Sequence, residues 1–325
     1  MQQGNPTSLR VPDPGVADLL AQDARWQAWL DVEAALAKAE AELQMSPGPA
    51  AEEIVRKCDL SLFDRARLTE GFQRTGHSLV PLIWEMSRLC DGDAGNYVHW
   101  GATTQNITQT GDLLQLRKVH RVFLRQIGAI LAALADLAER SKDMALPGRT
   151  HGQHAVPATY GLKAAVWIDE FARNVERLEQ SEPRVFQAML GGAAGTVASF
   201  GDRGLEVQAR MAAHLEMPPM AVPARNIMDH LAEHIMALAL LAASCGKFAN
   251  EIYTGMKQEF GEVEEPFTAG TVGSSTMPQK RNPFISQDIM AYTAQIRTMV
   301  PLALEAVMTE HEANRQTSLM MRQAQ

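Results

Sequence analysis

Several features are scarce in this chain, and each scarcity narrows what the protein can be. Cysteine occurs only three times in 325 residues, at Cys58, Cys90 and Cys245, so the three cannot all pair, and their spacing fits no metal site. Such usage is typical of a reducing compartment. No run is as long as the roughly 18 apolar residues of a membrane span, and residues 1–14 lack the apolar core of a secretory leader. We therefore expect a cytoplasmic protein with no membrane partner.

Basic charge is scarce as well. The 30 lysines and arginines are outnumbered by 38 aspartates and glutamates, which gives a net charge of −8. A nucleic-acid partner would need a basic face, so we expect none. We also expect no cofactor, since the glycine-rich run at 191–195 follows no strand pattern. His151 and His154 have no carboxylate or cysteine beside them, which disfavours a metal-dependent hydratase and any bound metal.

Alternation of apolar and polar residues, the pattern of a strand, is almost absent. Apolar residues instead recur every three or four positions, which predicts an all-α protein. We expect a long helix over 16–44, shorter helices to about residue 89, and four long helices over about 105–142, 155–188, 228–260 and 284–322. Helices of about 30 to 40 residues span roughly 45–60 Å. We therefore divide the chain into an N-terminal helical domain, 1–97, and a central long-helix bundle, 98–325.

Parts of these helices are apolar on every side. The run at 235–243 reads IMALALLAA, and a helix that is apolar all round must be buried all round. A short bundle made by one chain cannot bury all such faces. The pattern therefore predicts self-association.

Residues 270–283, which read GTVGSSTMPQKRNP, gather groups that can do chemistry. Their two glycines allow positive φ and close approach to a ligand, while the two prolines stiffen the far side. A dry loop rich in N–H donors, with Lys280 six residues after Ser274, would stabilise a serine alkoxide and make it a base. In an extended segment, Lys280 and Asn282 face the same way and can hold one carboxylate. The alternative is an ordinary surface loop.

Two further polar segments interrupt the helical pattern. Residues 98–106 (VHWGATTQN) precede the first long helix, and Thr103 and Thr104 would offer hydroxyl and N–H groups to an anion there, unless they only cap the helix. Residues 148–157 (GRTHGQHAVP) lie in a loop between helices and place Thr150 and His151 among other hydrogen-bonding groups. A structural histidine is the alternative there.

Together, the three segments resemble the fumarase/aspartase superfamily of lyases. The family signature, Gly-Ser-Ser-x-Met-Pro-x-Lys-x-Asn-Pro, stands at 273–283, and the other two segments follow the family order. The resemblance covers nearly the whole chain. It is nearest to the branch of adenylosuccinate lyase and 3-carboxy-cis,cis-muconate cycloisomerase, through WGATTQ at 100–105 and THGQHA at 150–155. It implies a homotetramer around a twenty-helix core, in which three subunits line each active site.

The resemblance also implies an activity, the elimination of a β-substituent from a succinate-like substrate through a dianionic aci-carboxylate intermediate. Ser274 matches the base that removes the proton next to a carboxylate. His151 is our candidate for steering or protonating the leaving group, with simple binding as the alternative. The candidate substrate-binding residues are Thr103, Thr104, Gln105, Thr150, Lys280, Asn282, Met277, His77 and Arg225. For His77, the alternative is a helix cap.

Departures from the pattern of this branch bear on the substrate. Relatives commonly carry Thr-Ser-x-Asp where this chain reads TTQN at 103–106, and Gln-Arg-Asp where it reads ARN at 224–226, so two acids are replaced by amides. The loss of negative charge favours a more anionic or differently substituted substrate than adenylosuccinate. A cycloisomerase acting on a tricarboxylate stays open, and so does the release of a small amine or nitrite from a substituted succinate.

The end of the chain departs too. Relatives continue into a small helical domain after the last bundle helix, whereas this chain stops at Gln325, so we expect that domain to be absent. In the family it helps to close the site, which puts the activity of this polypeptide in question. A catalytically silent helical scaffold is therefore the alternative function, although the intact Ser274, Lys280, Asn282 and His151 argue against it.

Overall fold

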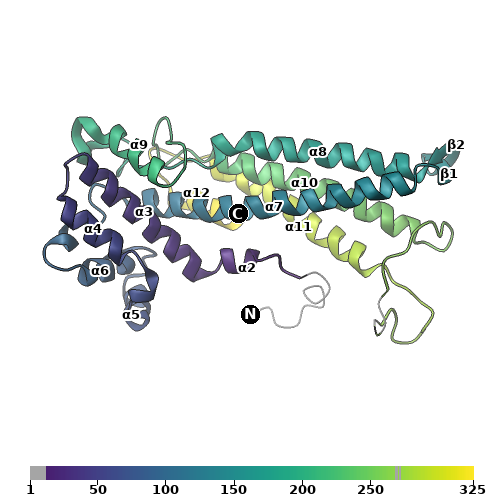
Figure 1. Cartoon of the computed structure of the whole chain (residues 1–325), viewed down its shortest axis with the longest axis horizontal. Coiled ribbons are helices and arrows are strands. Elements are labelled where there is room, and N and C mark those ends of the chain that lie inside the picture. The colour runs from purple at the N-terminus through teal and green to yellow at the C-terminus, as the bar shows by residue number, and fades with distance from the viewer. Residues whose placement is uncertain (1–11, 268–269, 271) are drawn as a thin grey trace.

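The computed structural model describes residues 12–267, 270 and 272–325. Four long helices run side by side along its longest axis (Figure 1). They are α7 (Thr104–Arg140), α8 (Tyr160–Val185), α10 (Asp229–Gly255) and α11 (Phe284–Val307). α10 packs against both α8 and α11, and α7 packs against α8. The all-α long-helix bundle that the sequence predicted is confirmed.

Shorter elements gather around the end of the bundle at which α7 begins (Figure 1). They are α2 (Val16–Leu19), α3 (Gln22–Glu42), α4 (Gly48–Lys57), η1 (Leu60–Leu62), α5 (Arg65–Thr75), α6 (Val80–Leu89), η2 (Ala94–Tyr97), η3 (Ala198–Arg203) and α9 (Gly204–His214). A final helix, α12 (Arg315–Ala324), packs against α11. The division into domains 1–97 and 98–325 stays a prediction.

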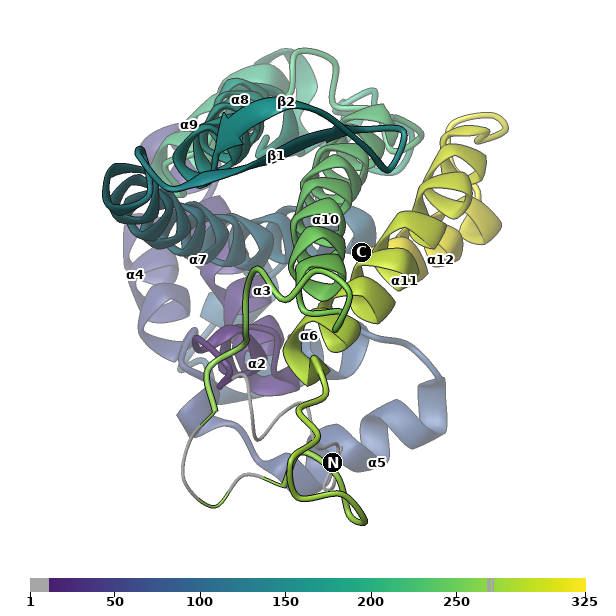
Figure 2. The same ribbon diagram turned by 90° about the vertical axis from the view of Figure 1, so that its right-hand side faces the viewer.

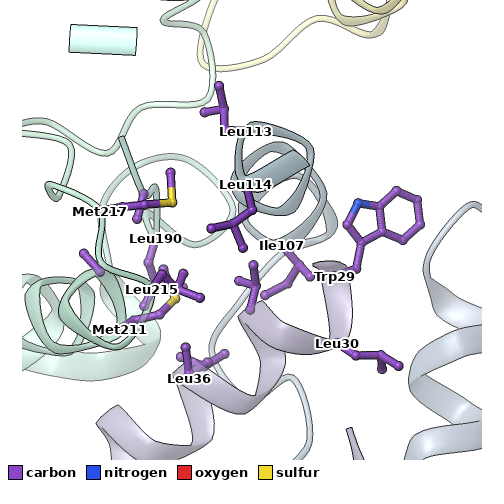
Figure 3. Close-up of a cluster of buried hydrophobic side chains, with 14 of the residues drawn as sticks. Trp29, Leu30, Leu36, Ile107, Leu113, Leu114, Leu190, Met211, Leu215 and Met217 are labelled. Carbon is purple, nitrogen blue, oxygen red and sulfur yellow. The ribbon is translucent and has the colours of Figure 1, made fainter. Parts of the chain in front are cut away.

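One apolar core joins α3, the start of α7 and α9 (Figure 3). Leu36, Ile107 and Met211 are each no more than 1% exposed. Burial of a side chain of this size stabilises the fold by about 1.5–3 kcal/mol. A second cluster, around Trp167 and Phe171, holds the far parts of α7, α8 and α10 together. Together, the two clusters hold α7, α8 and α10 along most of their length, and the second half of α11 joins the first cluster.

Local sequence explains where two of the long helices begin. The Thr103 hydroxyl accepts a backbone N–H of the first turn of α7, and the Asn106 side chain accepts the Thr103 N–H at 3.0 Å, which makes a capping box. The Thr159 hydroxyl accepts the Leu162 N–H at 3.2 Å at the start of α8. The cap reading of Thr103 is therefore correct, whatever else this residue binds.

The expected helix over 155–188 begins only at Tyr160, which corrects the prediction. An antiparallel hairpin stands before it, formed by β1 (Ala145–Thr150) and β2 (Gln153–Thr159) and placed beyond the end of the bundle (Figure 1). Most of β2 is exposed. No residue of either strand is fully buried, so the hairpin needs no alternation of apolar and polar residues and the pattern did not reveal it.

Two other expected helices are interrupted. The helix expected over 16–44 is split into α2 and α3 around Leu20. The helix expected over 284–322 ends at Val307, and α12 begins after a turn in which His311 has φ 51° and the Asn314 side chain accepts the Gln316 N–H at 2.8 Å. An asparagine cap of this kind starts a new helix.

Of the helices that the structure describes, α10 alone has the length and apolar composition to cross a membrane, and 28% of its most apolar stretch is buried within the chain. Its packing between α8 and α11 is that of a bundle helix. Met236 and Leu240 on this helix stay 39% and 45% exposed. These side chains are the uncovered apolar surface that the sequence led us to expect.

Candidate functional site

A cavity of about 400 Å³ opens at the end of the bundle where α7 begins. Its wall combines the loop after α5, the first turns of α7, the segment before α10, and α12. The polar lining residues that matter here are His77, Thr104, Gln105, Asp112, Arg225, Arg315, Ser318 and Arg322. Tertiary structure thus brings together four sequence candidates, namely His77, Thr104, Gln105 and Arg225.

His77 links the loop between α5 and α6 to the start of α7. Its Nδ1 accepts the N–H groups of Leu79 at 3.2 Å and Val80 at 3.1 Å, so the ring caps α6. The ring proton of a neutral imidazole then lies on Nε2, which is 3.4 Å from Thr104 Oγ1. The cap reading of His77 is correct. The same ring also lines the cavity, so substrate binding by His77 stays a prediction.

Gln105 and Arg225 hold each other across the cavity wall. Arg225 Nε donates to Gln105 Oε1 at 3.1 Å, and Gln105 Nε2 donates to the Arg225 carbonyl at 2.8 Å. Arg225 also donates to the Ala193 carbonyl at 2.7 Å. Burial lowers the pKa of Arg225, but a guanidinium stays charged at any physiological pH. The wall therefore carries a fixed cation beside the first turn of α7.

Asp112 is the acidic residue of this cavity, and it is already paired. Arg25 Nε and Nη2 donate to its two oxygens at 2.8 and 2.5 Å, and Trp29 Nε1 donates to one of them at 2.9 Å. Arg315 and Arg322 form no ion pair with any residue that the structure describes. The cavity therefore holds more positive than negative charge.

The two arginines of α12 were not predicted from the sequence. Burial and the charges of Arg25 and Arg315 lower the pKa of Arg322, against the opposing charge of Asp112. An anion in the cavity would satisfy both arginines. The sequence feature that could have revealed them is Asn314, whose side chain caps α12. Recognising this cap would have shown that Arg315 and Arg322 belong to a separate helix and not to a continuation of α11.

Thr150 and His151 lie at the other end of the bundle. Thr150 pairs with Gln153 across the hairpin, and His151 and Gly152 make the two-residue turn at φ 51° and 75°. Both candidate side chains are exposed. α7 has 37 residues, so its two ends are about 55 Å apart. Within one chain, the hairpin that follows α7 cannot reach Thr104 at its start.

Ser274 lies in the segment between α10 and α11, on the hairpin side of the bundle (Figure 1). Its Oγ accepts the N–H groups of Thr276 at 3.4 Å and Met277 at 3.2 Å. Such donors favour the ionised form of a hydroxyl, so this arrangement suits a serine that must lose its proton. In the view along the bundle, the part of this segment next to α11 lies on the opposite side of the molecule from the β hairpin (Figure 2).

The other candidates of this loop either contact the loop itself or are exposed. Asn282 Nδ2 donates to the Gly273 carbonyl at 2.8 Å, so this amide closes the loop on itself. The side chains of Lys280 and Met277 are exposed, and Lys280 makes no ion pair within the described part of the chain. Carboxylate binding by Lys280 and Asn282 stays a prediction.

Comparison with known proteins agrees with the fold. The chain matches the family model described as "Lyase" over residues 10–297. It is 40% identical over 290 residues to N-acetyl-S-(2-succino)cysteine lyase of Enterococcus italicus, covering 89% of this chain and 64% of that protein. It is 40% identical over 310 residues to adenylosuccinate lyase of Methanothermobacter thermautotrophicus, with coverage of 95% and 69%.

Solved structures give the same result. The 3-carboxy-cis,cis-muconate lactonizing enzyme from Pseudomonas putida matches with a TM-score of 0.88 and 31% identity, over 96% of this chain and 70% of that one. The fold and the matched sequence place the chain in a family of mainly helical lyases. The chain belongs to the fumarase/aspartase superfamily, with relatives in the branch of adenylosuccinate lyase and carboxymuconate cycloisomerase. It spans 64% of the first of these curated relatives and 69% of the second.

Proposed function

We propose that this chain carries out a lyase reaction in which Ser274 removes a proton from a substituted succinate and a β-substituent then leaves. The observation that supports this most is the position of Ser274 Oγ, which accepts two backbone N–H groups within the family signature loop. Those donors stabilise the alkoxide that a serine base needs.

The proposed reaction has two steps. The Ser274 alkoxide takes the proton from the carbon next to a carboxylate, and the electron pair of that C–H bond moves into the carboxylate to form a dianionic aci-carboxylate. The pair then returns to form a C=C bond and expels the β-substituent, which takes a proton from His151. Hydroxyl, amide and ammonium groups that bind the dianion better than the substrate lower the barrier. We assign this binding to Thr103, Thr104, Thr150, Lys280 and Asn282.

The cavity near Thr104 bears on the substrate class. Arg225, Arg315 and Arg322 surround a space whose acidic residue is already paired, so it suits a substrate with an anionic group beyond its succinyl part. The names of the two relatives denote succinate derivatives of a thiol and of an amine. A tricarboxylate, as in carboxymuconate cycloisomerisation, also meets this charge requirement, whereas a small amino- or nitro-succinate has no such extra anionic group and stays in the test as a smaller alternative. No cofactor is needed for this chemistry.

The active site also needs more than one chain. Thr104 lies about 55 Å from the end of α7 that leads to His151, so no single subunit brings the two to one ligand. We propose a homotetramer with shared active sites, in which the exposed apolar side chains of α10 and α11, including Leu240 and Ile296, are buried between subunits. We place this assembly in the cytoplasm.

A substrate panel tests the proposal. The purified protein is mixed with N-acetyl-S-(2-succino)cysteine, adenylosuccinate, argininosuccinate, aspartate, malate, nitrosuccinate and carboxymuconate, and unsaturated-acid absorbance is followed. We expect one substrate to react, and Ser274→Ala to lower its kcat by about 10²–10⁴-fold, the usual contribution of a general base. Ser275→Ala, the adjacent hydroxyl, should stay within about threefold of the unaltered protein, since it is not the proposed base. No reaction with any substrate, in a protein that still assembles, would favour the catalytically silent scaffold.

A further inference from the structure

We propose that Glu265 is a positioning residue for Ser274. Ser274 lies in the segment that connects α10 to α11, which we call the serine loop. The carboxylate of Glu265 joins the two ends of this loop at Ile285 and Ser286, a contact that we call the neck, and so sets the position of Ser274. The inference rests on the proposed function of Ser274. It concerns a residue outside the signature at 273–283.

Glu265 joins the start of the loop to the first turn of α11. Its Oε1 accepts the Ser286 N–H at 2.7 Å and the Ser286 hydroxyl at 2.6 Å, and its Oε2 accepts the Ile285 N–H at 3.1 Å. Pro283 stands at the N-cap of α11 and provides no side-chain cap. A carboxylate from about twenty residues earlier therefore satisfies N–H groups that would otherwise lack a partner.

The contacts continue from this neck to the residue before the proposed base. An ideal Cβ on Gly273 would lie 2.3 Å from the Lys280 carbonyl oxygen and 3.4 Å from the Phe267 ring. The Asn282 side chain donates to the Gly273 carbonyl. Gly273 is thus held between both sides of the loop, and Ser274 follows it directly. A shift of the neck would move Ser274 with it.

Glu264, the neighbour of Glu265, offers a natural control. It pairs with Arg281 at 2.8 Å, also across the neck, but the two side chains are 55% and 48% exposed. Exposed ion pairs of this kind contribute little, since water screens them. Ser286, by contrast, is 3% exposed, so water cannot easily replace its bonds to Glu265. Substitution of Glu265 should therefore affect the position of Ser274 much more than substitution of Glu264.

The test compares Glu265→Gln with Glu264→Gln, using the substrate found in the panel. A misplacement of about 1 Å can lower a rate by about 100-fold, so we expect Glu265→Gln to lower kcat by at least about tenfold. KM should change less, because the substitution leaves the cavity at the start of α7 untouched. Glu264→Gln should stay within about twofold. Ser286→Ala should have an intermediate effect that is not additive with Glu265→Gln, since both remove the same contact.

Hydrogen exchange supplies a measurement that does not need activity. Glu265→Gln should speed exchange of the Ile285 and Ser286 amides and of residues 272–282, and Glu264→Gln should not. Unchanged exchange in Glu265→Gln overturns the inference, and so does faster exchange with an unchanged kcat. If the unaltered protein reacts with no substrate, the proposed function fails separately, and exchange still decides whether Glu265 holds the neck.

Discussion

Two buried carboxyl groups on α3 show how differently one residue type can behave. Glu33 and Glu40 are each 1% exposed. His99 Nδ1 lies 2.6 Å from Glu33 Oε1, which gives Glu33 a partner, whereas Glu40 Oε1 has no hydrogen-bond partner among the described residues. Burial, and then the charge of Glu33, raises the pKa of Glu40 to about 8. Glu40 is therefore a neutral acid at neutral pH.

This shift predicts how stability depends on pH. With a folded pKa of about 8, against an ordinary value of 4.5, Glu40 stays protonated in the folded state while the unfolded state ionises. Its contribution is complete below pH 4.5 and is lost as pH rises through about 8, at up to about 1.4 kcal/mol per pH unit. Glu40→Gln cannot ionise, so urea unfolding at pH 5 and pH 8 should show the variant gaining on the unaltered protein at the higher pH. An equal difference at both pH values would contradict the shift.

At the scale of elements, two glycines on α7 face different surroundings. A Cβ on Gly111 would lie 2.5 Å from Trp29 Cδ1 and 3.1 Å from the Ala28 carbonyl, so α3 approaches α7 here as closely as a backbone allows. A Cβ on Gly128 would meet nothing within 4 Å. The first glycine is required by packing, and the second is not required by any contact within the chain.

Alanine at these two positions should therefore have opposite effects on stability. Gly111→Ala forces α3 away from α7, and we expect it to lower the free energy of unfolding by about 1–3 kcal/mol. Gly128→Ala replaces a poor helix former at an open position, so it should raise the free energy of unfolding by about 0.5–1 kcal/mol. Thermal or urea unfolding of both variants measures the difference. A loss at Gly128 equal to that at Gly111 would show that the packing between α3 and α7 is not the cause.

At the scale of the whole molecule, the proposed catalytic groups occupy opposite ends of a long bundle. Thr104 stands at the start of α7, while the hairpin and the serine loop lie toward its far end (Figure 1). The shared active site that we propose would resolve this separation, because an antiparallel neighbouring chain would bring the opposite end of its bundle to the same place. In mixed oligomers of two variants, each altered in a different segment, some active sites would then contain neither substitution.

Mixing variants tests this arrangement. Thr104→Val and Ser274→Ala should each be nearly inactive alone, and a refolded equal mixture should regain activity in about a quarter of its sites, if each site draws these two segments from different chains at random. Each variant refolded alone is the control. No gain in a mixture that forms mixed oligomers would place both segments of a site in one chain.

The sequence predicted which segments are helical better than it predicted where the helices begin and end. The recurrence of apolar residues every three or four positions predicted α7 and α10, because both helices contribute residues to the two apolar clusters. The hairpin at 145–159 was missed because neither strand contains a fully buried residue that would shape the pattern. The start of α12 was missed because its signal is one capping side chain, Asn314, within a polar stretch.

The same contrast applies to the site. Residue types and their order in the chain pointed to the serine loop, to Thr103 and Thr104 at the start of α7, and to His151 in the hairpin turn, because each of these candidates lies in a short segment with a recognisable local sequence. Which groups meet was decided only by tertiary structure. Arg322 joins His77 and Thr104 because α12 packs back along α11, and Glu265 reaches Ser286 across a loop. The sequence by itself determined the helical class and the choice of candidate residues. Three-dimensional packing decided which groups lie next to them, because distances between remote segments depend on how helices pack and not on local patterns.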